Sequence, residues 1–324
     1  MFQQLVEFLD SIPFFSSLTF GIIAMIIVGS SWCLVGLVMG DAPKKGIEPS
    51  LVQFGGAIVS TMIGTTIMVT TSAYSTAETL PTILTCSAYF VGSCLNFVML
   101  QFMSKAMQLG PNGIIWAIIQ SALVFPFIVG ILGFDVQFTI LRGIGIISLL
   151  SALVLFAFTK NNEVKNGNKK WKLYAFFCLS ICAIQQNLTT MPSYFEEARG
   201  VSSILRSVSA ASGLLIMSII WNLVQMTRER WVQIKSNIRN KTLWKYIGAL
   251  QFFGLLFSYT LFYPGLNVMA SKGMGGMCYP MMVGSCIVSF TLSSVWLLKE
   301  KMRPLQLAAL LVCICGLILI CTKA

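Results

Sequence analysis

Side-chain amides interrupt an otherwise apolar stretch of this sequence. Gln185, Gln186 and Asn187 follow one another in the run CAIQQNLTTMPSYFEE at 182–197. An amide both donates and accepts hydrogen bonds, so it can bind the polar groups of a small solute. Successive residues of a helix lie about 100° apart, so the three amides cannot all face one cavity. We expect at least one of them to bond an adjacent helix.

Other polar and aromatic residues recur near the middle of apolar stretches. The candidate binding residues are Trp32, Asn96, Gln120, Gln185, Gln186, Asn187, Tyr259, Tyr263, Ser285 and Ser289. For any single amide, service as hydrogen-bonding glue between helices is an equally good reading. As a group, these residues fit a pocket with neutral hydrogen-bonding groups beside aromatic walls. That chemistry suits a sugar, an amino acid or another polar small solute, whereas a strongly anionic solute would need fixed cations.

Charged side chains are scarce within the apolar stretches. Glu196 and Glu197 follow Pro192, and Arg206 comes soon after them. Two readings remain open: these residues form a solvated ion-pair cluster with Arg199, or Arg206 pairs with Glu196 or Glu197 as a gate. The chain has no histidine, so coupling to protons would fall to these carboxylates.

The cysteines do not form a metal-binding pattern. The 10 cysteines include no C-x-x-C pair, and the sequence has no histidine. We therefore expect no metal and no cofactor, and interpret the cysteines as small apolar filler. An integral-membrane enzyme would need constellations of histidine, aspartate or cysteine, so the sequence argues against an enzyme.

The elements that must position these residues are membrane spans. Of 324 residues, 56% are hydrophobic and 10% are charged, whereas soluble domains typically carry about a quarter charged residues. A span needs about 20 apolar residues. Ten such runs begin near Leu18, Leu51, Leu80, Gly113, Phe138, Leu173, Val201, Tyr246, Gly275 and Pro304. Their length predicts an all-α membrane protein of ten transmembrane helices. The N-terminal run does not read as a signal peptide, so we expect the first span to be retained.

The basic residues predict the orientation of the chain. With ten spans, the odd-numbered connections hold 17 of the 22 lysines and arginines. Short loops rich in lysine and arginine remain in the cytoplasm. We therefore expect a multi-pass inner-membrane protein with both termini outside the cytoplasm. The same asymmetry explains the net charge of +11 without a nucleic-acid partner.

The chain divides into two sets of five spans. The predicted units are a first repeat at 1–159, a basic cytoplasmic linker at 160–172 and a second repeat at 173–324. Segments 110–160 and 274–323 have the same layout of a glycine-containing entry, a long span, a short turn and a closing span. Because five is odd, the second copy enters the membrane inverted, as in many secondary transporters.

The ends of the repeats resemble a known family. YPMMVGSCIVSFTLSSVWLLKEKMRPLQLAALLVCICGLILI at 279–320, with its LKE turn, resembles the drug/metabolite transporter superfamily, which is built from two EamA-like five-helix repeats. DAPKKGIEPSLVQFGG at 41–56 and LPTILTCSAYFVGSCLNFVMLQF at 80–102 resemble the L-rhamnose permease branch more narrowly. That branch implies proton symport. The corresponding turn of the first repeat reads GFDVQF, so only Asp135 is acidic there.

These observations predict a secondary transporter that moves a small polar solute by alternating access. The alternatives are an exporter of drugs or other amphipathic metabolites and a non-transporting membrane scaffold. Channels usually carry rings of charge or filter motifs, which the sequence lacks. The expected partners are the solute and membrane lipids, and the protein is a monomer or a homodimer.

Overall fold

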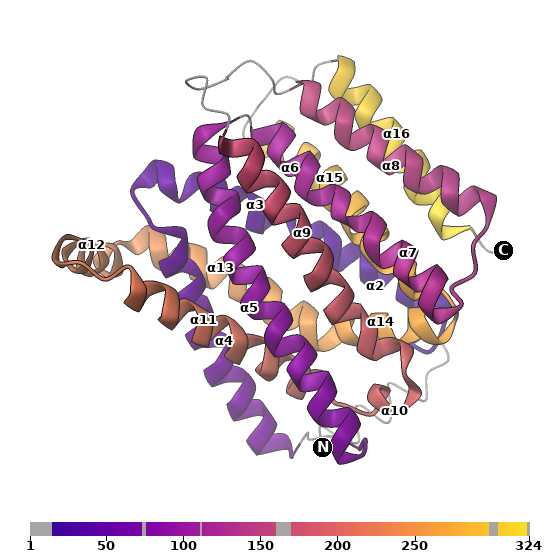
Figure 1. Ribbon diagram of the computed structural model, residues 1–324, viewed down its shortest axis with the longest axis horizontal. Coiled ribbons are helices and arrows are strands. Elements are labelled where there is room, and N and C mark those ends of the chain that lie inside the picture. The colour runs from indigo at the N-terminus through magenta and orange to yellow at the C-terminus, as the bar shows by residue number, and fades with distance from the viewer. Residues whose placement is uncertain (1–14, 73–75, 111, 160–169, 298–303, 323–324) are drawn as a thin grey trace.

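The computed structural model describes residues 15–72, 76–110, 112–159, 170–297 and 304–322. Within these residues every regular element is a helix, as the sequence predicted (Figure 1). The first ten residues of the predicted linker, and the LKE turn at 298–300, lie outside the described residues.

The helices follow the apolar runs of the sequence. Those of the first half are α2 (Leu18–Ser31), α3 (Cys33–Asp41), η1 (Pro43–Lys45), α4 (Pro49–Thr71), α5 (Thr79–Leu109), α6 (Asn112–Gln120), η2 (Ser121–Leu123), α7 (Val124–Phe134) and α8 (Ile140–Thr159). Those of the second half are α9 (Lys170–Thr190), η3 (Met191–Tyr194), α10 (Glu196–Arg199), α11 (Ser203–Val224), α12 (Arg228–Arg239), α13 (Lys241–Phe257), η4 (Ser258–Phe262), α14 (Tyr263–Ser271), η5 (Gly275–Met277), α15 (Cys278–Leu297) and α16 (Pro304–Cys321).

Local sequence signals explain several helix ends. The Ser17 and Ser202 hydroxyls accept hydrogen bonds of 3.2 Å from the backbone N–H groups of Phe20 and Leu205, which caps α2 and α11. Asp135 adopts a left-handed conformation, with φ of 50°, where α7 ends. Each signal stops or starts a helix at the boundary of an apolar run.

Three of the long apolar runs are not continuous α-helices. Trp32 separates α2 from α3, and its N–H bonds the carbonyl oxygen of Gly29 at 3.0 Å, three residues back. The 3-10 turn η2 joins α6 to α7, and the π-helical turn η4 joins α13 to α14. Such irregular turns are often found at functional sites.

Helices from the two halves of the chain interleave. In the second half, α9 packs against α5, α11 against both α4 and α5, and α15 and α14 against α2. Glycines allow the closest approaches. A Cβ atom on Gly29 would lie 2.2 Å from the carbonyl oxygen of Met282, and one on Gly213 would lie 2.2 Å from that of Phe90. These contacts leave no room for larger side chains at the crossings.

Two helices lie at one edge of the molecule. The helices α8 and α16 run side by side there (Figure 1), and on their inner side α8 packs mainly on α6 and α16 on α15. Gly145 and Gly316 meet at this pair, because a Cβ atom on either would lie 2.8 Å from the carbonyl oxygen of the other. Few polar side chains lie in these two helices, which suits a place at the edge of the bundle.

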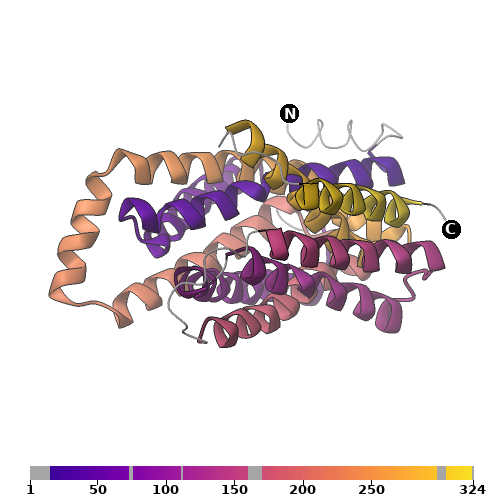
Figure 2. The same cartoon turned by 90° about the horizontal axis from the view of Figure 1, so that it is seen from above.

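Basic connections gather at one end of the bundle. Lys45 pairs with Asp41 at 2.6 Å, and its Nζ also donates to the hydroxyl of Tyr246 at 3.1 Å. Arg230 of α12 pairs with Glu48 at 2.8 Å, so the first and seventh predicted connections touch. The helix α12 lies at the extreme edge of this end and runs across the direction of its neighbours (Figure 2).

The other end is closed by a second set of connections. The N–H of Thr76 donates to the carbonyl oxygen of Gly200 at 3.1 Å, and the rings of Phe134 and Tyr194 stack with centroids 4.1 Å apart. The ring of Tyr194 also fills the space beside Gly275. Connections of even number therefore meet here, opposite the basic end.

The helices are those of a multi-pass membrane protein. Eight helical segments of the described chain are long and apolar enough to cross a bilayer, and Ile140–Leu155 is a shorter apolar helix. The eight do not include α9, whose amide run and lysines lower its hydropathy. The count of ten spans therefore remains a prediction.

Candidate functional site

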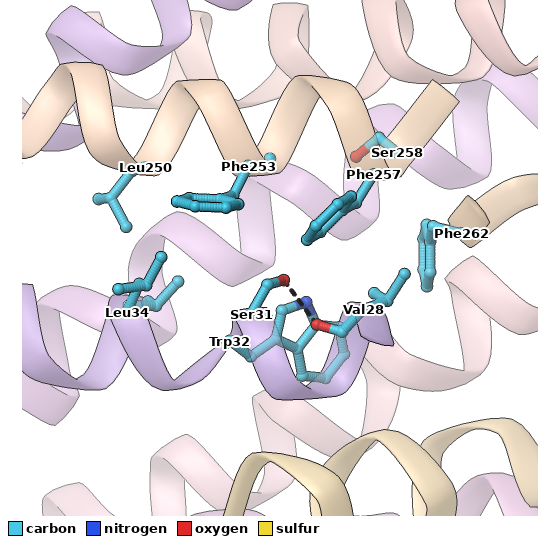
Figure 3. Close-up of a pocket in the computed structure, with 11 residues that line it drawn as sticks. Val28, Ser31, Trp32, Leu34, Leu250, Phe253, Phe257, Ser258 and Phe262 are labelled. Atoms are coloured by element: carbon cyan, nitrogen blue, oxygen red, sulfur yellow. Dashed lines mark hydrogen bonds between the residues drawn. The ribbon is translucent and has the colours of Figure 1, made fainter. Parts of the chain in front are cut away.

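A pocket lies between two of the interrupted helical runs (Figure 3). It has a volume of about 190 Å³ and opens between the α2–α3 break and the segment from α13 into η4. Its lining residues are Val28, Ser31, Trp32, Leu34, Val35, Leu250, Phe253, Gly254, Phe257, Ser258 and Phe262. The first and eighth predicted spans, one from each half of the chain, therefore form its walls.

The pocket walls are mainly apolar and aromatic. The side chains of Phe253, Phe257 and Phe262 face Trp32 across the space (Figure 3). The hydroxyl of Ser31 donates to the carbonyl oxygen of Val28 at 2.6 Å, so it is already satisfied within its own helix. A solute body that is apolar or aromatic matches these walls.

A buried tyrosine cluster adjoins the pocket. The ring of Trp32 lies 5.9 Å from that of Tyr279, whose hydroxyl forms a short hydrogen bond with the Thr189 hydroxyl. The Tyr89 hydroxyl donates to the main-chain oxygen of Thr189 at 2.9 Å, and its ring meets that of Tyr263 edge-on at 5.0 Å. We refer to Tyr89, Thr189, Tyr263 and Tyr279 as the central cluster. It joins α5, α9, α14 and α15.

Arg206 lies beside the central cluster and is fully buried. Its guanidinium donates to the carbonyl oxygen of Ala198 at 2.7 Å and to Oδ1 of Asn267 at 2.9 Å, and it lies 5.9 Å from the ring centre of Tyr89. Of the two readings of the sequence, the solvated ion-pair cluster is therefore wrong for Arg206, because this arginine is not solvated.

The predicted gate carboxylates lie apart from Arg206. The side chains of Glu196 and Glu197 are exposed, and Arg206 forms no ion pair with any carboxylate of the described residues. Arg199, the other predicted member, bonds the backbone oxygens of Ser193 and Tyr194. Burial of α10 against α5 and η3 explains the difference, because it turns Ala198 inward and leaves the two glutamates in solvent.

Several buried polar atoms around the cluster have no hydrogen-bond partner among the described residues. They are Nε of Arg206 and the hydroxyl oxygens of Ser193, Tyr194, Ser207 and Tyr259. The phenol of Tyr89 lies beside Arg206 and Ser193, and that of Tyr263 lies beside Ser207 and Tyr259. Unsatisfied buried groups are uncommon in folded proteins, so their concentration here marks a place that can bind a polar group.

The three consecutive amides of α9 point in different directions, as the helical spacing predicted. Gln186 is buried and donates to Sγ of Cys182 at 3.2 Å, while its Oε1 has no partner among the described residues. Asn187 donates to the carbonyl oxygen of Ala183 at 2.8 Å. Both bonds stay within α9, so the expected bond to an adjacent helix is not found for these two. Gln185 is half-buried.

Asn96 and Gln120 do not line the pocket. Asn96 is half-buried on α5 and lies between Gly92 and Met99, both of which contact α9. The spacing of four and three residues places Asn96 on the same face of α5. Gln120 is half-buried and directly precedes the turn η2.

The remaining predicted residues divide between the cluster and helix packing. Trp32 lines the pocket, Tyr263 belongs to the central cluster, and the Tyr259 hydroxyl is buried in η4. Ser285 is buried, donates to backbone oxygens of its own helix and lies against α2, so it serves packing. Ser289 is half-buried on α15 and does not line the pocket.

The sequence analysis missed Tyr89, Thr189 and Tyr279. Each carries a hydroxyl within an apolar run, and such a group needs a partner in the membrane for the same reason as an amide. Applying that criterion to tyrosine and threonine would have found all three.

The chain was also compared with known proteins. No family model and no curated protein matches it. Among 27 matching chains of solved structures, one described as "Crystal structure of protein" is similar with a TM-score of 0.66. The similarity covers 94% of this chain and 96% of that chain at 12% identity, which establishes a shared fold alone.

Proposed function

We propose that the protein is a secondary transporter that moves a small polar solute across the membrane by alternating access. The observation that carries this proposal is the position of the site: the pocket and the central cluster lie where helices from both halves of the chain meet. The hydroxyl groups of the central cluster are buried, and irregular turns adjoin both the cluster and the pocket. Transporters of this general architecture bind their substrates near the midplane at broken helices.

The packing pattern supports an inverted repeat of ten spans. In chain order the proposed spans are α2–α3, α4, α5, α6–α7 and α8, then α9, α11, α13–α14, α15 and α16. An inverted repeat relates span 1 to span 6, span 2 to span 7, and so on. When each span is replaced by its counterpart, each main contact between two spans corresponds to another contact that is also found. The contact of spans 1 and 9 becomes that of 6 and 4, and the contact of 2 and 8 becomes that of 7 and 3. Spans 2 and 7, and spans 5 and 10, pair with each other.

This symmetry and the apolar spans favour membership of the drug/metabolite transporter superfamily. The basic end of the bundle would then face the cytoplasm, with both termini on the other side of the inner membrane. In this account the exposed Glu196 and Glu197 remain candidates for proton coupling.

The pocket favours one alternative within the same class. Its walls are aromatic and aliphatic, so an exporter of drugs or other amphipathic metabolites also fits the lining. The two readings differ in the solute and in the direction of transport, and the same experiment separates them.

Transport by purified protein in liposomes tests the proposal. Solutes that raise the melting temperature of the detergent-purified protein are selected from sugars, amino acids, organic acids and cationic dyes. We expect a selected solute to enter proteoliposomes saturably, to undergo counterflow, and to respond to an imposed pH gradient if protons are coupled.

A matched tryptophan pair controls for unspecific damage. Trp32→Ala removes a pocket wall and should lower uptake, whereas Trp244→Ala changes a side chain that is 53% exposed and should not. Equal uptake by the two variants would show that Trp32 does not line the transport site. Uptake no greater than in empty liposomes for every selected solute would remove the basis for a transporter.

A further inference from the structure

We infer that the site binds its solute through a carboxylate, with Arg206 as the counter-ion. This inference rests on the proposed transport function and narrows the class of solute. It differs from the expectation of a neutral site, which the sequence suggested because the candidate binding side chains are uncharged.

The charge of Arg206 is the first argument. A guanidinium stays protonated in proteins, so burial cannot be relieved by loss of a proton. Arg206 is 0% exposed, and it forms no ion pair with any of the described carboxylates. Buried charges are normally paired with an opposite charge, because desolvation is costly. The two neutral acceptors, on Ala198 and Asn267, do not supply one.

The unused donors of Arg206 are the second argument. Asn267 and Ala198 each accept one hydrogen bond, from Nη1 and Nη2 respectively, while Nε has no partner among the described residues. The hydroxyl of Ser207, the next residue on α11, lies beside the phenol of Tyr263 and has no other partner among the described residues. A carboxylate accepts two or more hydrogen bonds and matches the fork of a guanidinium, so it satisfies both requirements together.

The path from Arg206 to the pocket indicates the rest of the solute. The guanidinium lies over Tyr89, whose ring is 5.0 Å from Tyr263, and the ring of Tyr263 is 4.9 Å from Phe262. Phe262 lines the pocket, whose other walls include Phe257 and Trp32. A chain of ring contacts therefore connects the cation with the pocket. A small organic acid with an apolar or aromatic body fits this order of contacts.

A second buried arginine provides a matched comparison. Arg142 is 2% exposed, donates to the carbonyl oxygen of Gln137 at 2.7 Å, and also has an Nε without a partner among the described residues. It lies on α8, at the edge of the bundle, away from the central cluster. Replacing either arginine removes a buried charge, so we expect both variants to lose stability. Only the change at Arg206 should alter the selectivity for an anion.

Three probes with the same ring and different head groups test the inference. Phenylacetate, phenylacetamide and phenethylamine present an anion, a neutral amide and a cation, and their binding to the purified full chain is measured by titration and by thermal shift. We expect phenylacetate to bind at least about 30-fold more tightly than the amide, as for a buried charge pair with one partner removed.

The variants then assign that preference to a residue. Arg206→Gln should bring phenylacetate to the affinity of the amide, and Arg206→Lys should retain part of the preference, because lysine keeps the charge without the planar fork. Arg142→Gln should keep the full preference. If Arg206→Gln does not fold, the role of Arg206 is still tested by the Arg206→Lys variant and by the binding of the three probes to the wild-type protein.

Distinct outcomes separate the two proposals. Equal binding of phenylacetate and phenylacetamide, or an anion preference that survives in Arg206→Gln, overturns the role of Arg206 and leaves transport standing if solutes still accumulate. Absence of binding and of uptake for every solute tried overturns both.

Discussion

The phenol of Tyr89 donates a hydrogen bond of 2.9 Å to the main-chain oxygen of Thr189, which ties α5 of the first half to the end of α9 in the second. Thr189 lies in the last turn of α9, which ends at Thr190. Carbonyl groups at helix ends need partners from elsewhere, and here a side chain of another helix supplies one.

Replacing that phenol should weaken both the fold and the site. Tyr89→Phe removes one buried hydrogen bond and leaves the Thr189 oxygen unsatisfied, so we expect a loss of about 1 kcal/mol in stability and slower uptake. Thermal melting and proteoliposome uptake measure the two effects. Tyr174→Phe is the control, because its half-buried ring packs against Phe102 away from the cluster. Similar losses in both variants would count against a special role for Tyr89.

The amides of the spans should matter for transport more than for folding. We expect Asn96→Ala, Gln120→Ala and Gln186→Ala to reduce uptake by about three- to thirty-fold, which corresponds to the 0.6–2 kcal/mol of an intramembrane hydrogen bond. Asn187→Ala is the control, because that amide is half-buried and bonds its own helix, whereas Oε1 of Gln186 is buried without a partner among the described residues. Normal uptake in the three test variants would refute their assignment to the site.

A methyl group at a helix crossing should disrupt packing. In Gly213→Ala the added Cβ would lie 2.2 Å from the carbonyl oxygen of Phe90, so α5 and α11 must separate. We expect destabilisation of about 1–3 kcal/mol. In Gly248→Ala nothing lies within 4 Å of the new Cβ, and replacing glycine by alanine in a helix favours folding by up to about 1 kcal/mol. Melting temperatures that shift equally would show that the crossing tolerates the methyl group.

The orientation of the chain can be read with a fused reporter. A reporter enzyme that is active only outside the cytoplasm, fused after Ala324, should be active, and one inserted in the connection that holds α12 should be inactive. The reverse pattern would invert the proposed topology. A reporter that works only in the cytoplasm, placed at the same two positions, provides the complementary control.

The fold was predictable from the sequence further than the site was. Long uncharged runs fix helices, because a bilayer leaves the backbone no other way to satisfy its polar groups. Trp32 and Tyr263 were found because they stand out chemically within such runs. The burial of Arg206 was not predictable, since it depends on how α10 folds over the end of α11, and short segments between spans carry no periodic signal. The hydrogen bonds of Ser285 were not predictable either, because a serine that bonds its own helix looks the same in sequence as one that faces a solute.

The wide turn η4 sets the direction in which the following helix faces. A π-helical turn holds one more residue than an α-helical turn, so every side chain after it is rotated by about 100° relative to an uninterrupted helix. Tyr263 and Asn267 come directly after it and reach Tyr89 and Arg206. Deleting one residue within 258–262 would restore regular α-helical geometry and turn both side chains toward other neighbours. The direction in which the side chains of α14 point therefore depends on a single inserted residue.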